Sequence, residues 1–191
     1  MRSFLLVSHT VKVNGDFSLN SLAGDHGRID ILCHVIKNCF LVSNGIRTDT
    51  ILYIYFATDK LTIKMDGSSL KFINPDERST ASIIRNIFKE FTSYQVTGKE
   101  YHPGITLYRW SIEDILKSAK VSVIYLKEGG GYDPLSEESL FVLGDSMDLS
   151  ADEEKIINRY AINTVSISPI SLHADQCITV IHNRLDMYKT H

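Results

Sequence analysis

Residues 161–177 read Ala-Ile-Asn-Thr-Val-Ser-Ile-Ser-Pro-Ile-Ser-Leu-His-Ala-Asp-Gln-Cys, and this stretch decides the fold. It begins as a β-branched strand, breaks into a Ser/Pro loop and re-enters a helix. The apolar residues of that helix recur at helical spacing: Ala174, Cys177, Ile178, Ile181 and Leu185. Such a loop places backbone N–H groups and a new helix N-terminus beside an apolar wall. This setting suits a ligand with hydrogen-bonding edges and a negative end, although an ordinary strand-to-helix turn is the plainer interpretation.

Two earlier stretches have the same organisation. An apolar run over 121–126 leads into three glycines at 129–131, and a second run over 140–143 leads into Gly144 and Asp145. Before the first of these runs and after the second, Ser111 and Ser150 each precede an acid by three residues, a pattern typical of a helix N-cap. Strands that alternate with helices predict an α/β protein with a mainly parallel sheet, flanked by helices.

The first half of the chain fits this architecture and adds one hairpin. Phe4–Val7 is a continuous apolar run, which predicts a strand buried on both faces. A helix is expected over 28–42. Residues 61–65 and 70–72 are expected to pair as a β-hairpin around Asp66-Gly67, a common turn dipeptide.

Length and composition set the class of protein. A chain of 191 residues with 43% hydrophobic content is ample for a single domain over residues 1–191. No apolar run approaches the length of a membrane span, so we expect no membrane partner. Three cysteines without a C-x-x-C spacing argue against disulfides and a zinc site, and they favour a reducing cytoplasm.

The net charge of −3 is unevenly distributed. Residues 133–154 contain eight acids and no Lys or Arg, so the rest of the chain carries 20 basic and 15 acidic side chains. An acidic lobe beside a mildly basic remainder leaves RNA binding open.

In an open parallel sheet, ligands bind beyond the carboxyl ends of the strands. The three loops that follow residues 126, 143 and 167 are therefore expected to meet around one ligand slot. The three glycines at 129–131 do not form the G-x-G-x-x-G pattern of dinucleotide-binding folds, and Pro134 opposes an immediate helix. A nicotinamide oxidoreductase is thereby disfavoured. There is no P-loop, and the scattered histidines predict no metal site.

At this point the sequence resembles a known family. The motifs are Val142-Leu143-Gly144-Asp145, Val165-Ser166-Ile167-Ser168-Pro169 and the stretch from Leu172 to Ile178, together with Gly27-Arg28-Ile29-Asp30, Asn44-Gly45-Ile46-Arg47 and the residues 76–81. They are similar to the archaeal tRNA pseudouridine-54 N1-methyltransferases (TrmY) over nearly the whole chain, and more distantly to the Nep1-type rRNA pseudouridine N1-methyltransferases. Both belong to the SPOUT class. The resemblance implies a C-terminal trefoil knot, which sequence physics alone would not predict.

The resemblance also implies a cofactor, a substrate and site residues. S-adenosyl-L-methionine would be held within residues 121–191, and the residues expected to bind it are Leu126, Gly144, Ser166, Ile167, Ser168, Pro169, Leu172 and Cys177. SPOUT enzymes usually act as homodimers, and the substrate would be tRNA, with Arg28, Arg47 and Arg78 holding the pseudouridine and its phosphates. The product would be N1-methylpseudouridine in the T-loop. Asp30 is the expected aid to removal of the N1 proton.

Two other functions remain open from the sequence. The same fold acting on rRNA pseudouridine is one, and a noncatalytic RNA-binding module is the other. Cys177 is either a small core residue or part of the cofactor wall, and a nucleophilic role is the least favoured.

Overall fold

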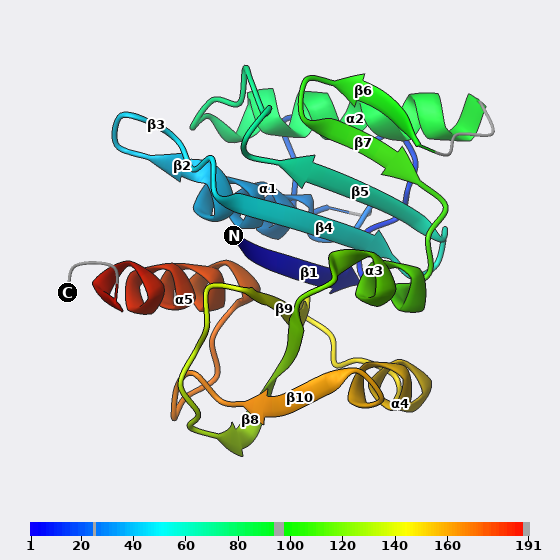
Figure 1. Cartoon of the computed structure of the whole chain (residues 1–191). Helices are drawn as coiled ribbons and strands as arrows, with labels where there is room; N and C mark the ends of the chain where they lie inside the picture. The colour runs from blue at the N-terminus through cyan, green and yellow to red at the C-terminus, as the bar shows by residue number, and fades with distance from the viewer. Residues whose placement is uncertain (25, 94–97, 189–191) are drawn as a thin grey trace.

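The computed structural model describes residues 1–24, 26–93 and 98–188, and in them a long mixed sheet is covered by helices on both faces (Figure 1). The strands are β1 (Arg2–Ser8), β2 (Leu41–Val42), β3 (Gly45–Ile46), β4 (Thr50–Phe56), β5 (Leu61–Asp66), β6 (Lys99–His102), β7 (Ile105–Tyr108), β8 (Ser122–Gly131), β9 (Ser139–Gly144) and β10 (Ala161–Val165). The helices are α1 (Ile29–Phe40), α2 (Glu77–Ser93), α3 (Ile112–Ala119), α4 (Ala151–Asn158) and α5 (Ala174–Tyr188).

The sheet has the strand order β10-β8-β9-β1-β4-β5-β7-β6. The five strands from β10 to β4 are parallel, whereas β5, β7 and β6 add antiparallel pairs. The predicted mainly parallel α/β architecture is confirmed.

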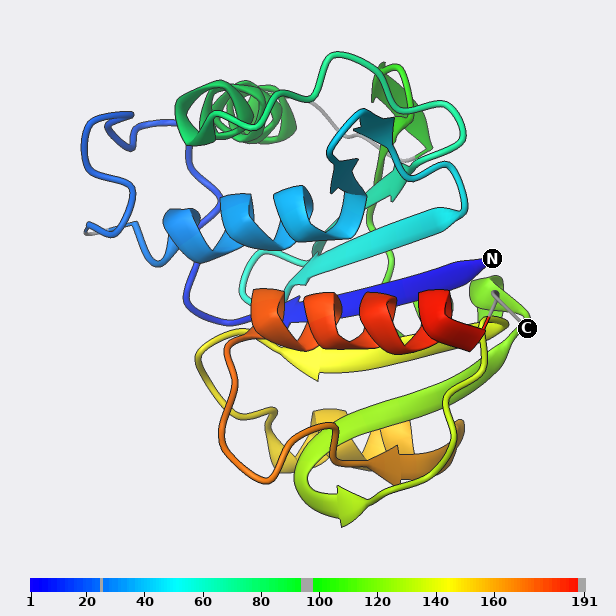
Figure 2. The same ribbon diagram turned by 90° about the vertical axis from the view of Figure 1, so that its left-hand side faces the viewer.

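The central strand β1 is buried along its whole length, as its apolar run predicted. Phe4 and Leu6 face a core formed with α1, α2 and α5, and Leu5 and Val7 face a second core formed with α3 and α4. Figure 2 shows α1 and α5 side by side across one face of the sheet. This double coverage explains why β1 has no polar alternation.

The structure contains the helix N-caps and the apolar helix face that the sequence predicted. Ser111 and Ser150 each accept a hydrogen bond from the third residue of their helix, and Asp114 and Glu153 close the two capping boxes. In α5, Ala174, Ile178, Ile181 and Leu185 are buried, which confirms the predicted apolar stripe. Within the described ranges, no helix has the combination of length and apolar character needed to cross a membrane.

The expected hairpin over 61–72 is wrong. β5 pairs with β4 on one side and with β7 on the other, so it offers no edge to a strand over residues 70–72. Asp66-Gly67 does form a turn, but the turn leads Leu70 into the core and leaves Phe72 exposed. The local turn signal was right, and the choice of partner strand was decided by distant segments.

Candidate active site

A large hollow lies where β8, β9 and β10 end. It has a volume of about 1150 Å³ and is bordered by residues 125–128 of β8, by the loops that follow β9 and β10, and by the first turn of α5. Strands β10, β8 and β9 are neighbours and parallel, so their carboxyl ends reach the same edge of the sheet. The three segments named from the sequence therefore border one site. The first of them is not a loop as expected, because β8 continues past residue 126 to Gly131.

Seven of the eight residues predicted to bind the cofactor line this hollow: Leu126, Gly144, Ser166, Ile167, Ser168, Leu172 and Cys177. Pro169 is not among the lining residues, although its neighbours Ser168 and Ile170 are. Gly144 allows a close approach of backbone, because a Cβ there would lie 2.8 Å from the Met147 carbonyl oxygen and 3.2 Å from Leu149 Cδ1. Any larger residue at 144 would push the loop 145–149 out of place.

The loop over residues 166–173 is fixed at both ends. The Ser166 backbone N–H donates to the Gly131 carbonyl at 2.8 Å, and the Ser166 hydroxyl donates to the Ser168 carbonyl at 2.8 Å. From α5, the Arg184 guanidinium donates to the Ile167 carbonyl at 2.7 Å. At the helix start, the His173 N–H donates to the Gln176 side chain at 2.9 Å. A loop held in this way presents a preformed wall to a ligand.

The lining is acidic. Glu128, Asp145, Asp148 and Glu154 contribute carboxylates, and Lys127 is the one Lys or Arg among the described lining residues. Lys127 is itself paired with Glu154 at 2.6 Å. Such a lining favours a ligand that carries positive charge.

Glu154 has a second donor, the Tyr125 hydroxyl, at 2.7 Å. The hydrogen bond from Lys127, followed by that from Tyr125, lowers the pKa of the Glu154 carboxyl below its ordinary value. Burial, together with the bond to Glu154, raises the pKa of Tyr125. The carboxylate therefore stays ionised and the phenol stays protonated at neutral pH.

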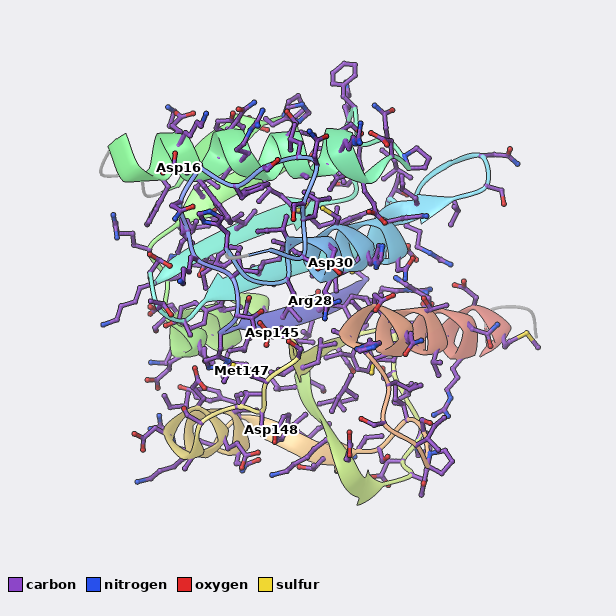
Figure 3. The ribbon with its side chains drawn as sticks, turned by 180° about the vertical axis from the view of Figure 1, so that it is seen from behind. Asp16, Arg28, Asp30, Asp145, Met147 and Asp148 are labelled. Carbon is purple, nitrogen blue, oxygen red and sulfur yellow. The ribbon has the colours of Figure 1, made fainter. Side chains whose placement is uncertain are left out.

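Arg28 and Asp30 form an ion pair at the start of α1. Arg28 Nε donates to Asp30 Oδ1 at 2.9 Å and to Oδ2 at 3.3 Å, and Arg28 Nη2 donates to Asp30 Oδ2 at 2.7 Å. The hydrogen bond from Arg28 lowers the pKa of Asp30 below its ordinary value. Figure 3 labels the pair together with Asp145 and Met147. Gly27, which precedes Arg28, packs on Thr10, and the Thr10 hydroxyl donates to Asp145, which lines the hollow. The ion pair itself is not part of the lining.

The family follows from the whole sequence. A family model described as "Putative SAM-dependent RNA methyltransferase" matches residues 1–190. The chain belongs to this family. The resemblance found in the sequence is thereby confirmed.

Curated relatives of these methyltransferases match at full length. The tRNA (pseudouridine(54)-N(1))-methyltransferase of Haloferax volcanii is 37% identical over 97% of this chain and 96% of the relative. The protein of the same name from Methanococcoides burtonii is 34% identical, again over 97% of this chain and 96% of the relative. The crystal structure of Archaeoglobus fulgidus Nep1 bound to S-adenosylhomocysteine superposes with a TM-score of 0.70, at 12% identity, and covers 100% of this chain and 99% of that chain. This last likeness shows the fold.

In this methyltransferase the predicted RNA-binding arginines lie apart. Arg47 is at the opposite edge of the sheet, where it donates to Asp186 at 2.6 and 3.2 Å and its side chain is 20% exposed. Arg78 is exposed in the first turn of α2. Of the three predicted arginines, Arg28 alone lies near the hollow.

Cys177 lines the hollow as a neutral thiol. Its Sγ lies 3.8 Å from the Leu172 carbonyl oxygen. Burial, reinforced by the charge of Asp175, raises the pKa of Cys177 to about 11. A thiol with that pKa is a poor nucleophile and a poor base at neutral pH. Among the residues that the structure describes, no cluster of His, Cys, Asp or Glu is arranged to hold a metal ion.

Sequence analysis missed the roles of Asp145 and Glu154. Both line the hollow, and Asp145 also accepts hydrogen bonds from Ser8 and Thr10 at the end of β1. The position of Asp145 directly after a buried strand was a usable signal, because carboxyl ends of strands carry ligand-binding residues. Glu154 belongs to a segment whose sequence predicted an acidic character and a helix N-cap at Ser150, and neither signal indicates a ligand.

Proposed function

We propose that this protein transfers a methyl group from S-adenosyl-L-methionine to N1 of pseudouridine 54 in the T-loop of tRNA, and that N1-methylpseudouridine is the product. The observation that carries the proposal is the hollow at the carboxyl ends of β8, β9 and β10, which seven residues named from the sequence line together. The full-length relatives, at 34 and 37% identity, are named for this reaction.

The residues of the hollow fit S-adenosyl-L-methionine. Its sulfonium and amino groups carry positive charge, which suits the carboxylates of Glu128, Asp145 and Asp148. We assign the adenine and ribose to the loop from Ser166 to Leu172, where backbone polar groups alternate with apolar side chains. The bound cofactor supplies an electrophilic methyl group, so the work left to the protein is alignment of that group with the target base.

The N1 proton of pseudouridine has to leave during the reaction. We propose that Asp30 assists its removal, directly or through a water molecule. The ion pair with Arg28 makes Asp30 a weak base, so we infer that Arg28 turns to an RNA phosphate in the complex and releases the carboxylate. Asp30→Ala is expected to lower turnover and leave cofactor affinity close to normal, whereas unchanged turnover would reject Asp30.

We assign phosphate binding to Arg28, Arg47 and Arg78, and we expect the target base to be splayed out of its stack. For Arg47, RNA binding requires exchange of the Asp186 carboxylate for a phosphate. Arg47→Ala should therefore reduce both stability and RNA affinity, and Arg78→Ala should reduce RNA affinity alone. Filter binding and thermal unfolding of the two variants separate these effects.

The resemblance to SPOUT enzymes supports three further proposals. We propose that the chain acts as one domain whose C-terminal segment, which enters α5, is threaded as a trefoil knot. We propose a homodimer, in which a second copy would bring its own arginines towards the hollow, and sedimentation velocity tests this state. We propose a cytoplasmic location, which fits a tRNA substrate and three free cysteines.

One assay tests the function. Purified protein is incubated with methyl-labelled cofactor and T-loop RNA that carries either uridine or pseudouridine at position 54, with rRNA as a second substrate. Label at N1 of pseudouridine 54 alone is expected. Label on rRNA alone would favour the rRNA alternative, and failure to bind the cofactor in calorimetry would favour a noncatalytic RNA-binding module.

A further inference from the structure

The side chain of Asp145 forms hydrogen bonds with two segments that are far apart in sequence, residues 8–10 and the loop after β9. Its Oδ2 accepts hydrogen bonds from the Ser8 hydroxyl at 2.9 Å, the His9 N–H at 2.9 Å, and the Thr10 N–H and hydroxyl at 3.0 and 2.8 Å. Its Oδ1 accepts a bond from the Met147 N–H at 3.0 Å. One carboxylate thus joins the end of β1 to the loop after β9.

A second carboxylate holds the same segment from the other side. The His9 ring nitrogen Nε2 lies 2.9 Å from Glu153, which also closes the capping box of α4. Ala151 and Glu154, in the first turn of that helix, line the hollow. Residues 8–10 are therefore fixed to two walls of the hollow without lining it themselves.

The fixed segment touches the start of α1. Gly27 has a φ of +92°, and a Cβ there would lie 1.9 Å from the Thr10 carbonyl oxygen. The Lys12 N–H donates to the His26 carbonyl at 3.2 Å. Gly27 thus packs directly on Thr10, and Arg28 follows it in the chain.

We propose that Asp145 is a positioning residue that holds the Arg28–Asp30 pair at a fixed place beside the cofactor hollow, through residues 8–10 and Gly27. The proposal rests on the proposed function, because it concerns alignment between the methyl donor and the groups that meet the RNA. Such alignment acts mainly on turnover, since a displacement of about 1 Å can cost about a hundredfold in rate.

Substitution of Thr10 tests the proposal without changing the cofactor site, because Thr10 does not line the hollow. Thr10→Val keeps the shape of the side chain and removes the hydroxyl donor to Asp145, whereas Thr10→Ser keeps that donor. We expect Thr10→Val to lower kcat on T-loop RNA about tenfold, with the cofactor Kd changed less than about twofold, and Thr10→Ser to retain turnover. Equal kcat for the two variants would overturn the proposal, as would a cofactor Kd that weakens as much as kcat falls.

A double-mutant cycle with Asp145→Ala tests whether the two residues act as one unit. The double variant Asp145→Ala/Thr10→Val should be no slower than Asp145→Ala, because alanine has no oxygen to accept the Thr10 bond. Additive losses would contradict the proposal. Asp66→Ala is the matched control: Asp66 accepts analogous bonds from the Ser68 N–H and hydroxyl at the other edge of the sheet, so its loss should leave kcat unchanged. A control that loses as much turnover as Asp145→Ala would also contradict it.

Amide hydrogen exchange measures, in the absence of RNA, the same coupling between Asp145 and the start of α1. Asp145→Ala should speed exchange in residues 8–12 and also in residues 26–31, and unchanged exchange at 26–31 would overturn the proposal. A wild-type protein that shows this coupling but does not methylate RNA would contradict the proposed function and leave the positioning role standing.

Discussion

The parallel strands begin at one edge of the sheet, the amino edge, and end at the other, the carboxyl edge. The charged side chains at these two edges differ in burial. At the amino edge, the Arg2 side chain is fully buried and is held by Asp49, Glu137 and Asp186 at 3.4, 2.9 and 2.9 Å. At the carboxyl edge, the charged groups border an open hollow, and the Arg28 side chain is 45% exposed.

At the amino edge, an ion pair between Arg2 and Asp186 joins β1 to α5. Besides Asp186, the guanidinium of Arg2 contacts His182 Nδ1 at 3.0 Å, and Asp186 also binds Arg47. The difference teaches that burial, rather than charge or pairing, separates Arg2 from an arginine that a substrate can reach, because Arg28 is also paired and yet 45% exposed.

The largest effect is expected at the carboxyl edge, from Gly144→Val. The added side chain would collide with the Met147 carbonyl and Leu149, and so displace one wall of the hollow. We expect the affinity for S-adenosyl-L-methionine to fall by about a hundredfold or more, measured by calorimetry. Gly45→Val is the control, because a Cβ at Gly45 meets nothing within 4 Å. Normal affinity in Gly144→Val would move the cofactor away from this hollow.

The amino edge is expected to respond in stability. Asp186→Ala removes a carboxylate shared by Arg2 and Arg47 and leaves the buried Arg2 cation with fewer partners. We expect a loss of about 3 kcal/mol in the free energy of unfolding, measured by urea titration, with cofactor affinity unchanged. A variant of normal stability would show that the ion pairs of Asp186 do not stabilise the packing of α5.

A smaller effect per pH unit is expected from acidification at the same edge. Burial, and then the charges of Arg47 and Arg2, lower the pKa of His182 from 6.5 to about 3. The folded state therefore holds this ring neutral while the unfolded state takes up a proton, so stability is complete above pH 6.5 and falls as the pH drops towards 3. The slope due to this one group is about 1.4 kcal/mol per pH unit.

His182→Gln isolates that contribution, because glutamine offers Arg2 an acceptor and does not titrate. Urea midpoints of the two proteins between pH 7 and pH 4 should diverge, with the wild type losing more stability as the solution becomes acidic. Parallel curves would mean that His182 is not held neutral.

The smallest effect is expected from Cys177→Ala. A thiol whose pKa is about 11 carries almost no negative charge at neutral pH, so it contributes packing and not chemistry. Turnover on T-loop RNA should change by less than about threefold. A loss of about a thousandfold, with the protein still folded, would make Cys177 a catalytic group.

The comparison of the two edges also separates the features that the sequence predicts from those that it does not. Signals that act over three or four residues were read correctly, such as the capping boxes at Ser111 and Ser150 and the apolar stripe of α5. Seven of the eight residues predicted to bind the cofactor line the hollow, because neighbouring parallel strands bring their segments together.

Most of what the sequence did not predict is contact over long sequence separation. The hairpin at residues 61–72 failed because β5 pairs with the preceding strand β4 on one side and with the more distant β7 on the other. The bonds of Asp145 to residues 8–10 span at least 135 positions, and the pair of Arg47 with Asp186 spans 139. No local pattern in a single sequence carries that information.

The most direct test is a crystal structure of the protein with S-adenosylhomocysteine. The account predicts the ligand in the hollow between Leu126, Gly144 and the loop 166–172, with its sulfur facing the side where Arg28 and Asp30 begin α1. A ligand bound elsewhere, or one that touches fewer than two of the three loops, would contradict the account.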